Sequence, residues 1–291
     1  KPHLGLVCLT TTDEVRFRTI TRTRLRSLAT ELQPQTLREL YADNVRRLSN
    51  AIDFCARRKI HLYRLTSGLF PQSEEPPGFD IVSELAPELG RIGRRATELG
   101  IRLVMHPDQF VVLSSDNPQV VENSITILRH HARVLDLLEQ PRSAWAAVEI
   151  HGGKGNRASA LVERIPGLPD EIRSRLVLEN DEYAYSASEI LDVCRGAGVP
   201  MVFDAHHHVV HEKLDSYDDG SIAVMVAAAR ETWPDPSWQM VHISNGKSGF
   251  NDPDHADYID RMPPAFRDVF WIEVEAKKKE LAIDQLRRRW K

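Results

Sequence analysis

The sequence contains few cysteines and no long apolar segment. Its 291 residues include three cysteines, Cys8, Cys55 and Cys194, which are scattered and odd in number. We therefore expect no disulfide framework, and the pattern suits a reducing cytoplasm. No CxxC pair is present, which argues against zinc fingers and ribbons. No run of 18 apolar residues occurs, so we expect no transmembrane helix. The first residues lack the apolar core of a signal peptide.

The sequence also lacks a strong excess of charge of one sign. Its formal net charge of −4 is not that of a typical nucleic-acid-binding protein, although local basic loops and bound cations could supply a positive face. Arginines are dense between residues 16 and 26, at Arg16, Arg18, Arg22, Arg24 and Arg26. A solvated surface segment is the ordinary interpretation of such a run. Contact with phosphates is the alternative if this loop lies on a functional face.

Strand-like and helix-like segments alternate along the whole chain. Short apolar runs predict strands at residues 4–9, 60–65, 101–106, 145–151, 175–180, 200–204, 238–243 and 269–275. Amphipathic periodicity predicts helices at residues 36–58, 81–99, 117–139, 155–165, 186–196, 218–231, 255–261 and 277–290. Eight such units in series predict an α/β fold, a (β/α)₈ TIM barrel made by residues 1–291 as a single domain. A doubly wound sheet is the alternative.

Six of the expected strands end in a histidine or a carboxylate. These residues are His106, His151, Glu179, Asp204, His242 and Glu275. In a barrel of this type the C-terminal ends of the strands converge on one face. Three histidines and three carboxylates buried together would cost too much unless cations compensate them. The pattern therefore predicts a polynuclear metal site, and ligands without cysteine suit Zn²⁺, Mn²⁺ or Fe²⁺.

Two further histidines extend this set of ligands. His207 follows Asp204 by three residues within the run His206-His207-His208, and the spacing leaves open which of the three binds a metal. His255 lies at the start of the helix expected at 255–261, where a role as an exposed helix cap is the alternative.

This many ligands exceeds what one ion needs. Two or three close ions suit phosphate chemistry, because they create a hydroxide near neutral pH and bind both the attacking and the leaving oxygen. Sugar isomerases of barrel fold also use two divalent ions, so the metal count alone does not decide the substrate.

An amide and an aromatic side chain follow the third expected strand directly. Gln109 and Phe110 come just after His106, on what should be an exposed loop. An aromatic ring can wedge between DNA bases while an amide bonds to a base edge. The alternative is that Phe110 only anchors the loop against the rim of the barrel.

Several segments together resemble the UV damage endonucleases, a family of DNA repair nucleases whose barrel is similar to that of endonuclease IV. The resemblance covers nearly the whole chain. The segments that carry it include Tyr63-Arg64-Leu65-Thr66-Ser67, His106-Pro107-Asp108-Gln109-Phe110, Leu178-Glu179-Asn180-Asp181, Phe203-Asp204-Ala205-His206-His207, Val241-His242-Ile243-Ser244 and Glu275-Ala276-Lys277-Lys278-Lys279. The resemblance implies a metal-dependent endodeoxyribonuclease that cuts the backbone 5′ to ultraviolet photoproducts, both pyrimidine dimers and 6-4 photoproducts. Double-stranded DNA carrying such lesions is the expected partner, and a cytoplasmic monomer is the expected form.

The resemblance also implies roles for individual residues. The metal ligands would be His106, His151, Glu179, Asp204, His207, His242, His255 and Glu275. Glu179 would be the catalytic residue that bridges two ions, one held with His106 and His151 and the other with Asp204, His242 and Glu275. His207 and His255 would serve a third ion. Two or three divalent ions are implied, with Mn²⁺ favoured over Zn²⁺ or Mg²⁺.

The expected contacts with DNA lie around this site. Gln109 and Phe110 would probe the duplex opposite the lesion, while Arg16, Arg18, Arg22 and Lys247 would contact DNA. The sequence departs from some relatives at Phe110, where others have tyrosine, at Leu6, which replaces an aromatic, and at Met240, where some carry a modified lysine near the metals. A sugar isomerase or epimerase, and a damage-binding protein that does not cut, are the alternative functions.

Overall fold

The computed structural model describes residues 2–108 and 110–290, so the prediction made for Gln109 lies outside the described residues. Eight parallel strands close into a barrel in sequence order, each strand paired with the next and β8 paired with β1. The TIM barrel expected from the sequence is confirmed. The strands are β1 His3–Val7, β2 Leu62–Leu65, β3 Arg102–Met105, β4 Val148–His151, β5 Leu176–Glu179, β6 Met201–Asp204, β7 Met240–Ile243 and β8 Trp271–Val274.

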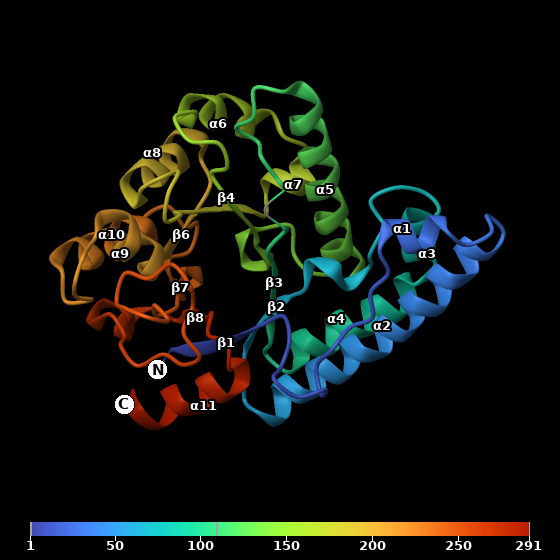
Figure 1. Cartoon of the computed structure of the whole chain (residues 1–291), viewed down its shortest axis with the longest axis horizontal. Coiled ribbons are helices and arrows are strands. Elements are labelled where there is room, and N and C mark those ends of the chain that lie inside the picture. The colour runs from blue at the N-terminus through green and yellow to red at the C-terminus, as the bar shows by residue number, and fades with distance from the viewer. Residues whose placement is uncertain (1, 109, 291) are drawn as a thin grey trace.

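Helices surround the barrel on its outer side (Figure 1). They are α1 Arg22–Arg26, α2 Leu32–Arg57, α3 Gly78–Glu84, α4 Ala86–Glu98, α5 Pro118–Leu137, α6 Ala158–Arg164, α7 Asp170–Arg173, α8 Ala187–Ala197, α9 Ala205–Glu212, α10 Gly220–Arg230 and α11 Lys279–Arg289. Local sequence explains where several begin. Asn117 caps α5 by accepting a hydrogen bond from the Gln119 amide, and Ser186 with Glu189 forms a capping box at α8. None of these helices is long and apolar enough to cross a lipid bilayer.

Two expected elements near the functional end of the barrel differ from the sequence-based assignment. The helix predicted at 255–261 is wrong, since those residues form an irregular loop with one isolated bridge between Gly246 and His255. The loop is held by other bonds, because the Asp252 carboxylate accepts from the Ser248 and Asp254 amides and the Ala256 amide donates to the Asn245 carbonyl. Conversely, the His-rich segment after β6, which was not among the expected helices, is helix α9.

The opposite end of the barrel interior is closed by an arginine and several tryptophans. Arg102 is fully buried and donates to the carbonyl oxygens of Trp145, Trp238 and Ala144 at 2.7, 2.8 and 3.0 Å. Burial lowers the pKa of Arg102 to about 9. Above this plug the buried residues Val104, Val177, Val202 and Met240 belong to one apolar cluster. This apolar layer separates the buried Arg102 from the C-terminal ends of the strands, where the polar groups gather.

Candidate metal centre

The carboxylate of Glu179, at the end of β5, lies at the centre of a cluster of imidazoles. Its Oε2 is 3.2 Å from Nε2 of His106 and 3.8 Å from Nε2 of His151. Its Oε1 is 3.1 Å from Nδ1 of His242 and 3.2 Å from Nδ1 of His207. Each oxygen thus faces a different pair of histidines, which is the arrangement required of a carboxylate that bridges two ions.

Potential ligand atoms within 4.8 Å of one another occur in four groups among residues 2–108 and 110–290. The groups are His106, His151 and Glu179; Glu149, Glu179 and His242; Glu179, Asp204 and His207; and Asp204, His242 and Glu275. The structure thus brings together seven of the eight ligands expected from the sequence. His255 joins none of these groups, and its Nδ1 lies 4.0 Å from Oε2 of Glu275.

Helix α9 selects one histidine from the run of three. Asp204 caps this helix by accepting a hydrogen bond from the His207 amide at 2.7 Å, which turns the His207 ring toward Glu179. His206 points elsewhere, because its Nε2 contacts the Asp252 carbonyl at 2.9 Å. His208 contacts the Ser221 hydroxyl, also at 2.9 Å. Of the three consecutive histidines, only His207 is therefore turned toward Glu179, because of its position on helix α9.

The charges of the cluster shift the pKa values of its members in opposite directions. Burial raises the pKa of the Glu179 carboxyl, but the imidazoles of His242 and His151 outweigh burial and hold that pKa well below its ordinary range. Burial lowers the pKa of His242, but Glu179 and Glu273 outweigh it and raise that pKa well above its ordinary value. The pKa of His207 is raised in the same way, mainly by Asp204 against the effect of burial. Without metal ions the cluster thus favours protons on His207 and His242, whereas burial lowers the pKa of His151.

The donor set fits divalent cations. Oδ2 of Asp204 and Nδ1 of His242 are buried without a hydrogen-bond partner among the described residues. Buried acceptors without partners are costly, and a cation within the cluster would satisfy them. Imidazole and carboxylate ligands without thiolates suit Mn²⁺, Zn²⁺ and related ions.

Three charged residues beside the cluster were given no role by the sequence. Glu149 and Glu273 lie one layer below the strand ends and are fully buried. Arg64 on β2 contacts Glu273 at 2.9 Å and Glu275 at 2.5 Å. The signal that could have identified the two glutamates is their alternation with His151 and Glu275, which places them on the same inner face of β4 and β8.

Two exposed aromatic side chains stand beside the metal cluster. Phe110 is 74% exposed, so little of its side chain packs against the rest of the protein. Tyr183, which the sequence did not single out, is 72% exposed. Its loop is fixed by the Asp181 carboxylate, which accepts a hydrogen bond from the Tyr183 amide at 2.8 Å. A cavity of about 350 Å³ lies between the two loops, lined by His106 and His151 among others.

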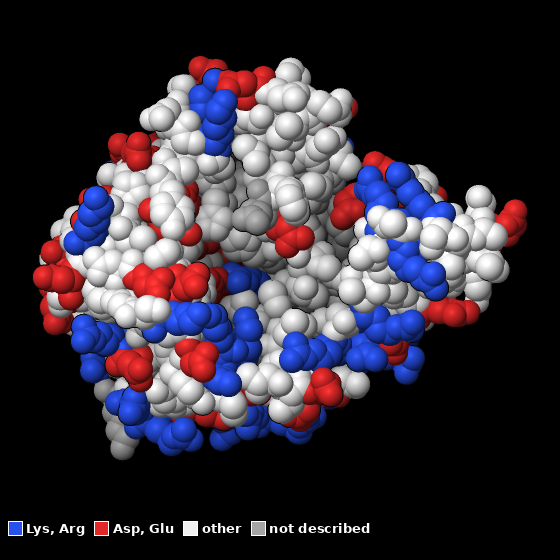
Figure 2. Space-filling view, in the orientation of Figure 1, with Lys and Arg blue, Asp and Glu red and all other residues white. Residues whose placement is uncertain are grey.

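The arginines after β1 form an exposed basic surface. Arg16 and Arg18 are partly exposed and only loosely paired, with Asp13 at 3.9 Å and Asp43 at 3.8 Å. Arg22 begins α1. Figure 2 shows Lys and Arg side chains gathered over α1 and the adjoining part of α2, beside a hollow in this face of the molecule. We refer to Arg16, Arg18 and Arg22 as the basic loop. Lys247 is exposed in the loop after β7, where its amide donates to the Asp254 carbonyl at 2.8 Å.

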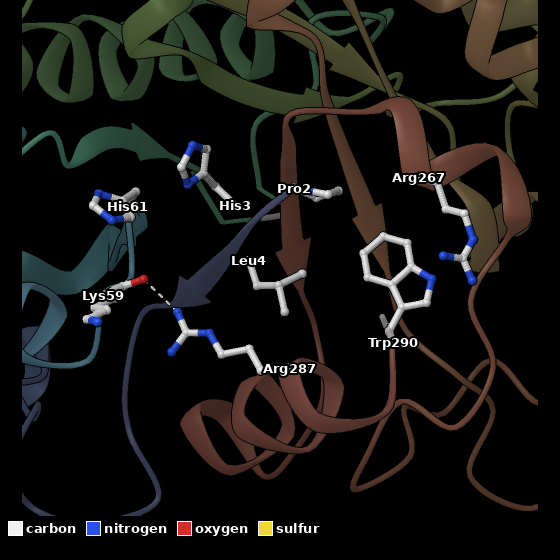
Figure 3. A pocket seen from close by; sticks show the side chains of 8 residues that line it. All are labelled: Pro2, His3, Leu4, Lys59, His61, Arg267, Arg287 and Trp290. Carbon is white, nitrogen blue, oxygen red and sulfur yellow. Dashed lines mark hydrogen bonds between the residues drawn. The ribbon is translucent and has the colours of Figure 1, made fainter.

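A larger cavity of about 700 Å³ lies at the opposite end of the barrel (Figure 3). It is lined by basic side chains and by Trp290, and Arg287 there donates to the Lys59 carbonyl at 2.6 Å. Pro2 and Trp290 adjoin positions 1 and 291, which are outside the described residues, so we assign this cavity no ligand.

Comparison with known proteins decides the family. The family model for UV-endonuclease UvdE matches residues 2–291. The chain belongs to the UV damage endonuclease family. Family membership makes it a nuclease. A UV DNA damage endonuclease of a Nostoc species is 53% identical over 292 residues, which cover 100% of this chain and 91% of the relative. Another from Deinococcus radiodurans is 50% identical over 289 residues, covering 98% of this chain and 95% of the relative.

Solved structures agree with this family assignment. The crystal structure of SacUVDE has a TM-score of 0.84 and 27% sequence identity, with 99% of each chain covered. Endonuclease IV from Thermus thermophilus matches with a TM-score of 0.61 at 13% identity, covering 99% of this chain and 98% of that chain. A D-psicose 3-epimerase from Clostridium cellulolyticum matches with a TM-score of 0.55 at 12% identity, covering 82% of this chain and 92% of the epimerase. The last two likenesses concern the fold alone.

Proposed function

We propose that this protein incises the backbone of double-stranded DNA 5′ to ultraviolet photoproducts, both pyrimidine dimers and 6-4 photoproducts. The single observation that carries the proposal is the cluster centred on Glu179, which faces two pairs of histidines in a chain about half identical to UV DNA damage endonucleases. A closely spaced set of imidazoles and carboxylates is typical of sites that cut phosphodiester bonds.

Two or three divalent ions would be held by the residues of the cluster. Glu179 would bridge two ions, with His106 and His151 on one side and Asp204, His242 and Glu275 on the other. His207 and His255 would serve a third. We favour Mn²⁺, with Zn²⁺ or Mg²⁺ as alternatives. Ions bound there would activate a water molecule and stabilise the charge that develops on the scissile phosphate.

The residues of this chain contribute in distinct ways. Because the pKa of Glu179 is held well below its ordinary range, its carboxylate stays anionic at neutral pH and is ready to bridge. Arg64 contacts Glu275 at 2.5 Å and so fixes the orientation of that expected ligand. The apolar layer below, which includes Val177 and Met240, keeps water out of the barrel interior.

The DNA would lie across the face that carries Phe110, Tyr183 and the basic loop. The exposure of Phe110 supports its role as a wedge, and Gln109 beside it remains the predicted partner. Tyr183, at the other side of the same cavity, would stack on a base of the opened duplex. The basic loop and Lys247 would neutralise phosphates.

The sugar epimerase alternative is supported only by a shared barrel, because the matching epimerase is 12% identical. A binding protein that does not cut would have no need for so complete a set of ligands. We also infer a cytoplasmic location, with which the three free cysteines agree. We infer a monomer as well, which light scattering can check.

A nicking assay on irradiated plasmid with added Mn²⁺, run beside a sugar epimerase assay, tests the proposed function. We expect nicks in irradiated plasmid and no epimerisation. Glu179→Gln should lower the incision rate by about 100-fold or more while the variant still binds DNA, because a bridging anion is lost. Near-normal incision by this variant, with unchanged metal content, would remove Glu179 from the bridging role.

A further inference from the structure

Beneath the metal cluster, two glutamates approach the far side of one expected ligand. Nε2 of His242 lies 2.8 Å from Oε2 of Glu149 and 2.9 Å from Oε2 of Glu273. The other ring nitrogen, Nδ1, faces Glu179 at 3.1 Å and Glu275 at 3.6 Å. The ring therefore separates two pairs of carboxylates, one in the metal cluster and one below it.

Among the described residues, Glu149 forms an ion pair with His242 and with no other side chain. It is fully buried, and neither of its oxygens makes a hydrogen bond to any described residue. A buried carboxylate is costly unless an interaction compensates it. The imidazole of His242, 2.8 Å from Oε2 of Glu149, can compensate this charge, so the interaction that explains the presence of Glu149 is with that ring.

Glu273 is linked to the metal cluster by a second path. Nη1 of Arg64 contacts Oε2 of Glu273 at 2.9 Å and Oε1 of Glu275 at 2.5 Å. The guanidinium therefore joins the lower glutamate to an expected ligand, and it supplies the positive charge that two neighbouring buried carboxylates need. His242, Glu273 and Glu275 are thereby held as one unit.

We propose that Glu149 and Glu273 are positioning residues of the metal centre, which keep the proton of His242 on Nε2 and direct the Nδ1 lone pair at the ions. A proton on Nε2 is attracted by both carboxylates, whereas a lone pair there would face two negative charges at under 3 Å. The tautomer is fixed by this asymmetry. Partners of this kind on the far nitrogen of a ligating histidine raise its basicity and orient its ring. The contribution of these two glutamates to incision rests on the proposed function. Their effect on metal binding by His242 does not.

The first test needs no variant. In protein loaded with Zn²⁺, which is diamagnetic, ¹⁵N spectra of the histidine rings should show His242 with its proton on Nε2 and its Nδ1 bound to metal. A spectrum in which Nε2 is the metal-bound nitrogen overturns the proposal, whatever the variants do.

The second test measures Mn²⁺ affinity calorimetrically after chelation of bound ions. Glu149→Gln and Glu273→Gln keep the side-chain shape and should each weaken Mn²⁺ binding by about 10-fold, and the double change by about 100-fold, the range known for such partners. Glu280→Gln is the matched control, because Glu280 is equally buried but bonds the Thr11 amide at 2.9 Å. Its Mn²⁺ affinity should equal that of the wild type.

Two outcomes would overturn the positioning role. Unchanged Mn²⁺ affinity with a lower melting temperature would make the glutamates structural only. The loss of one bound ion, with the affinity for the others unchanged, would make Glu149 a ligand. Failure of the wild type to nick irradiated DNA while these shifts in affinity occur would instead refute the proposed function and leave the positioning role intact.

Discussion

Replacing Phe110 with alanine separates a wedge from an anchor. The side chain is 74% exposed, so about a quarter of it is buried. Full burial of a phenylalanine contributes about 1.5–3 kcal/mol, so the change should cost less than about 0.8 kcal/mol of stability. For a chain of this size the melting temperature should fall by no more than about 1–2 °C.

The effect on DNA recognition should be much larger. Stacking of a base on an aromatic ring is worth about 1–3 kcal/mol, which corresponds to about 5- to 150-fold in affinity. Opening the duplex costs less free energy at a lesion than at an intact step, so the wedge acts mainly at lesions. Its loss should therefore lower the affinity for irradiated duplexes relative to that for intact duplexes.

The assay is titration of fluorescent duplexes with and without one photoproduct, beside thermal unfolding of the same samples. Phe110→Tyr should match the wild type, because the ring is what fills the gap. Phe270→Ala, at an aromatic residue that is 52% exposed and precedes β8 at the other end of the barrel, is the matched control. A ratio unchanged in Phe110→Ala, or a loss of stability above about 2 kcal/mol, would refute the wedge.

Three further outcomes are expected. Alanine at all three basic-loop positions should weaken binding to damaged and intact DNA alike and reduce the slope of log affinity against log salt by about 2–3, and an unchanged slope would make the loop an ordinary surface. Tyr183→Ala should weaken binding to photoproduct duplexes by about 5-fold or more while Tyr183→Phe does not, and equal binding by both would exclude stacking. Mn²⁺ affinity should rise with pH and keep rising above the ordinary histidine pKa of about 6.5, because the pKa values of His207 and His242 are raised and each must lose a proton to bind a metal. Calorimetry across pH checks this, and an affinity that levels off below pH 6 would contradict it.

Much of the fold and of the cluster follows from the sequence. The strand ends could be predicted because short apolar runs mark buried parallel strands. The C-terminal ends of such strands form one face of the barrel, so His106, Glu179 and Asp204 must meet there. The choice among His206, His207 and His208 could not, because it depends on where α9 begins and hence on the capping bond of Asp204.

Other features depend on contacts that a sequence does not encode locally. The segment 255–261 looks helical in isolation, but its backbone bonds to residues before and after it, such as the Ala256 amide to Asn245. Alternation along a strand could not distinguish Glu149 and Glu273 from metal ligands. Each lies two residues before an expected ligand and therefore points to the same inner face of the barrel. The exposure of Tyr183 depends on the turn closed by Asp181.

Incision of a synthetic duplex carrying a single pyrimidine dimer tests the central claim most directly. With Mn²⁺ present, the account predicts one cut on the damaged strand at the 5′ side of the dimer. It also predicts no cut in the intact duplex, after chelation of the metal, or by Glu179→Gln. Cutting that persists in chelator, or that is equal on intact and damaged duplexes, would contradict it.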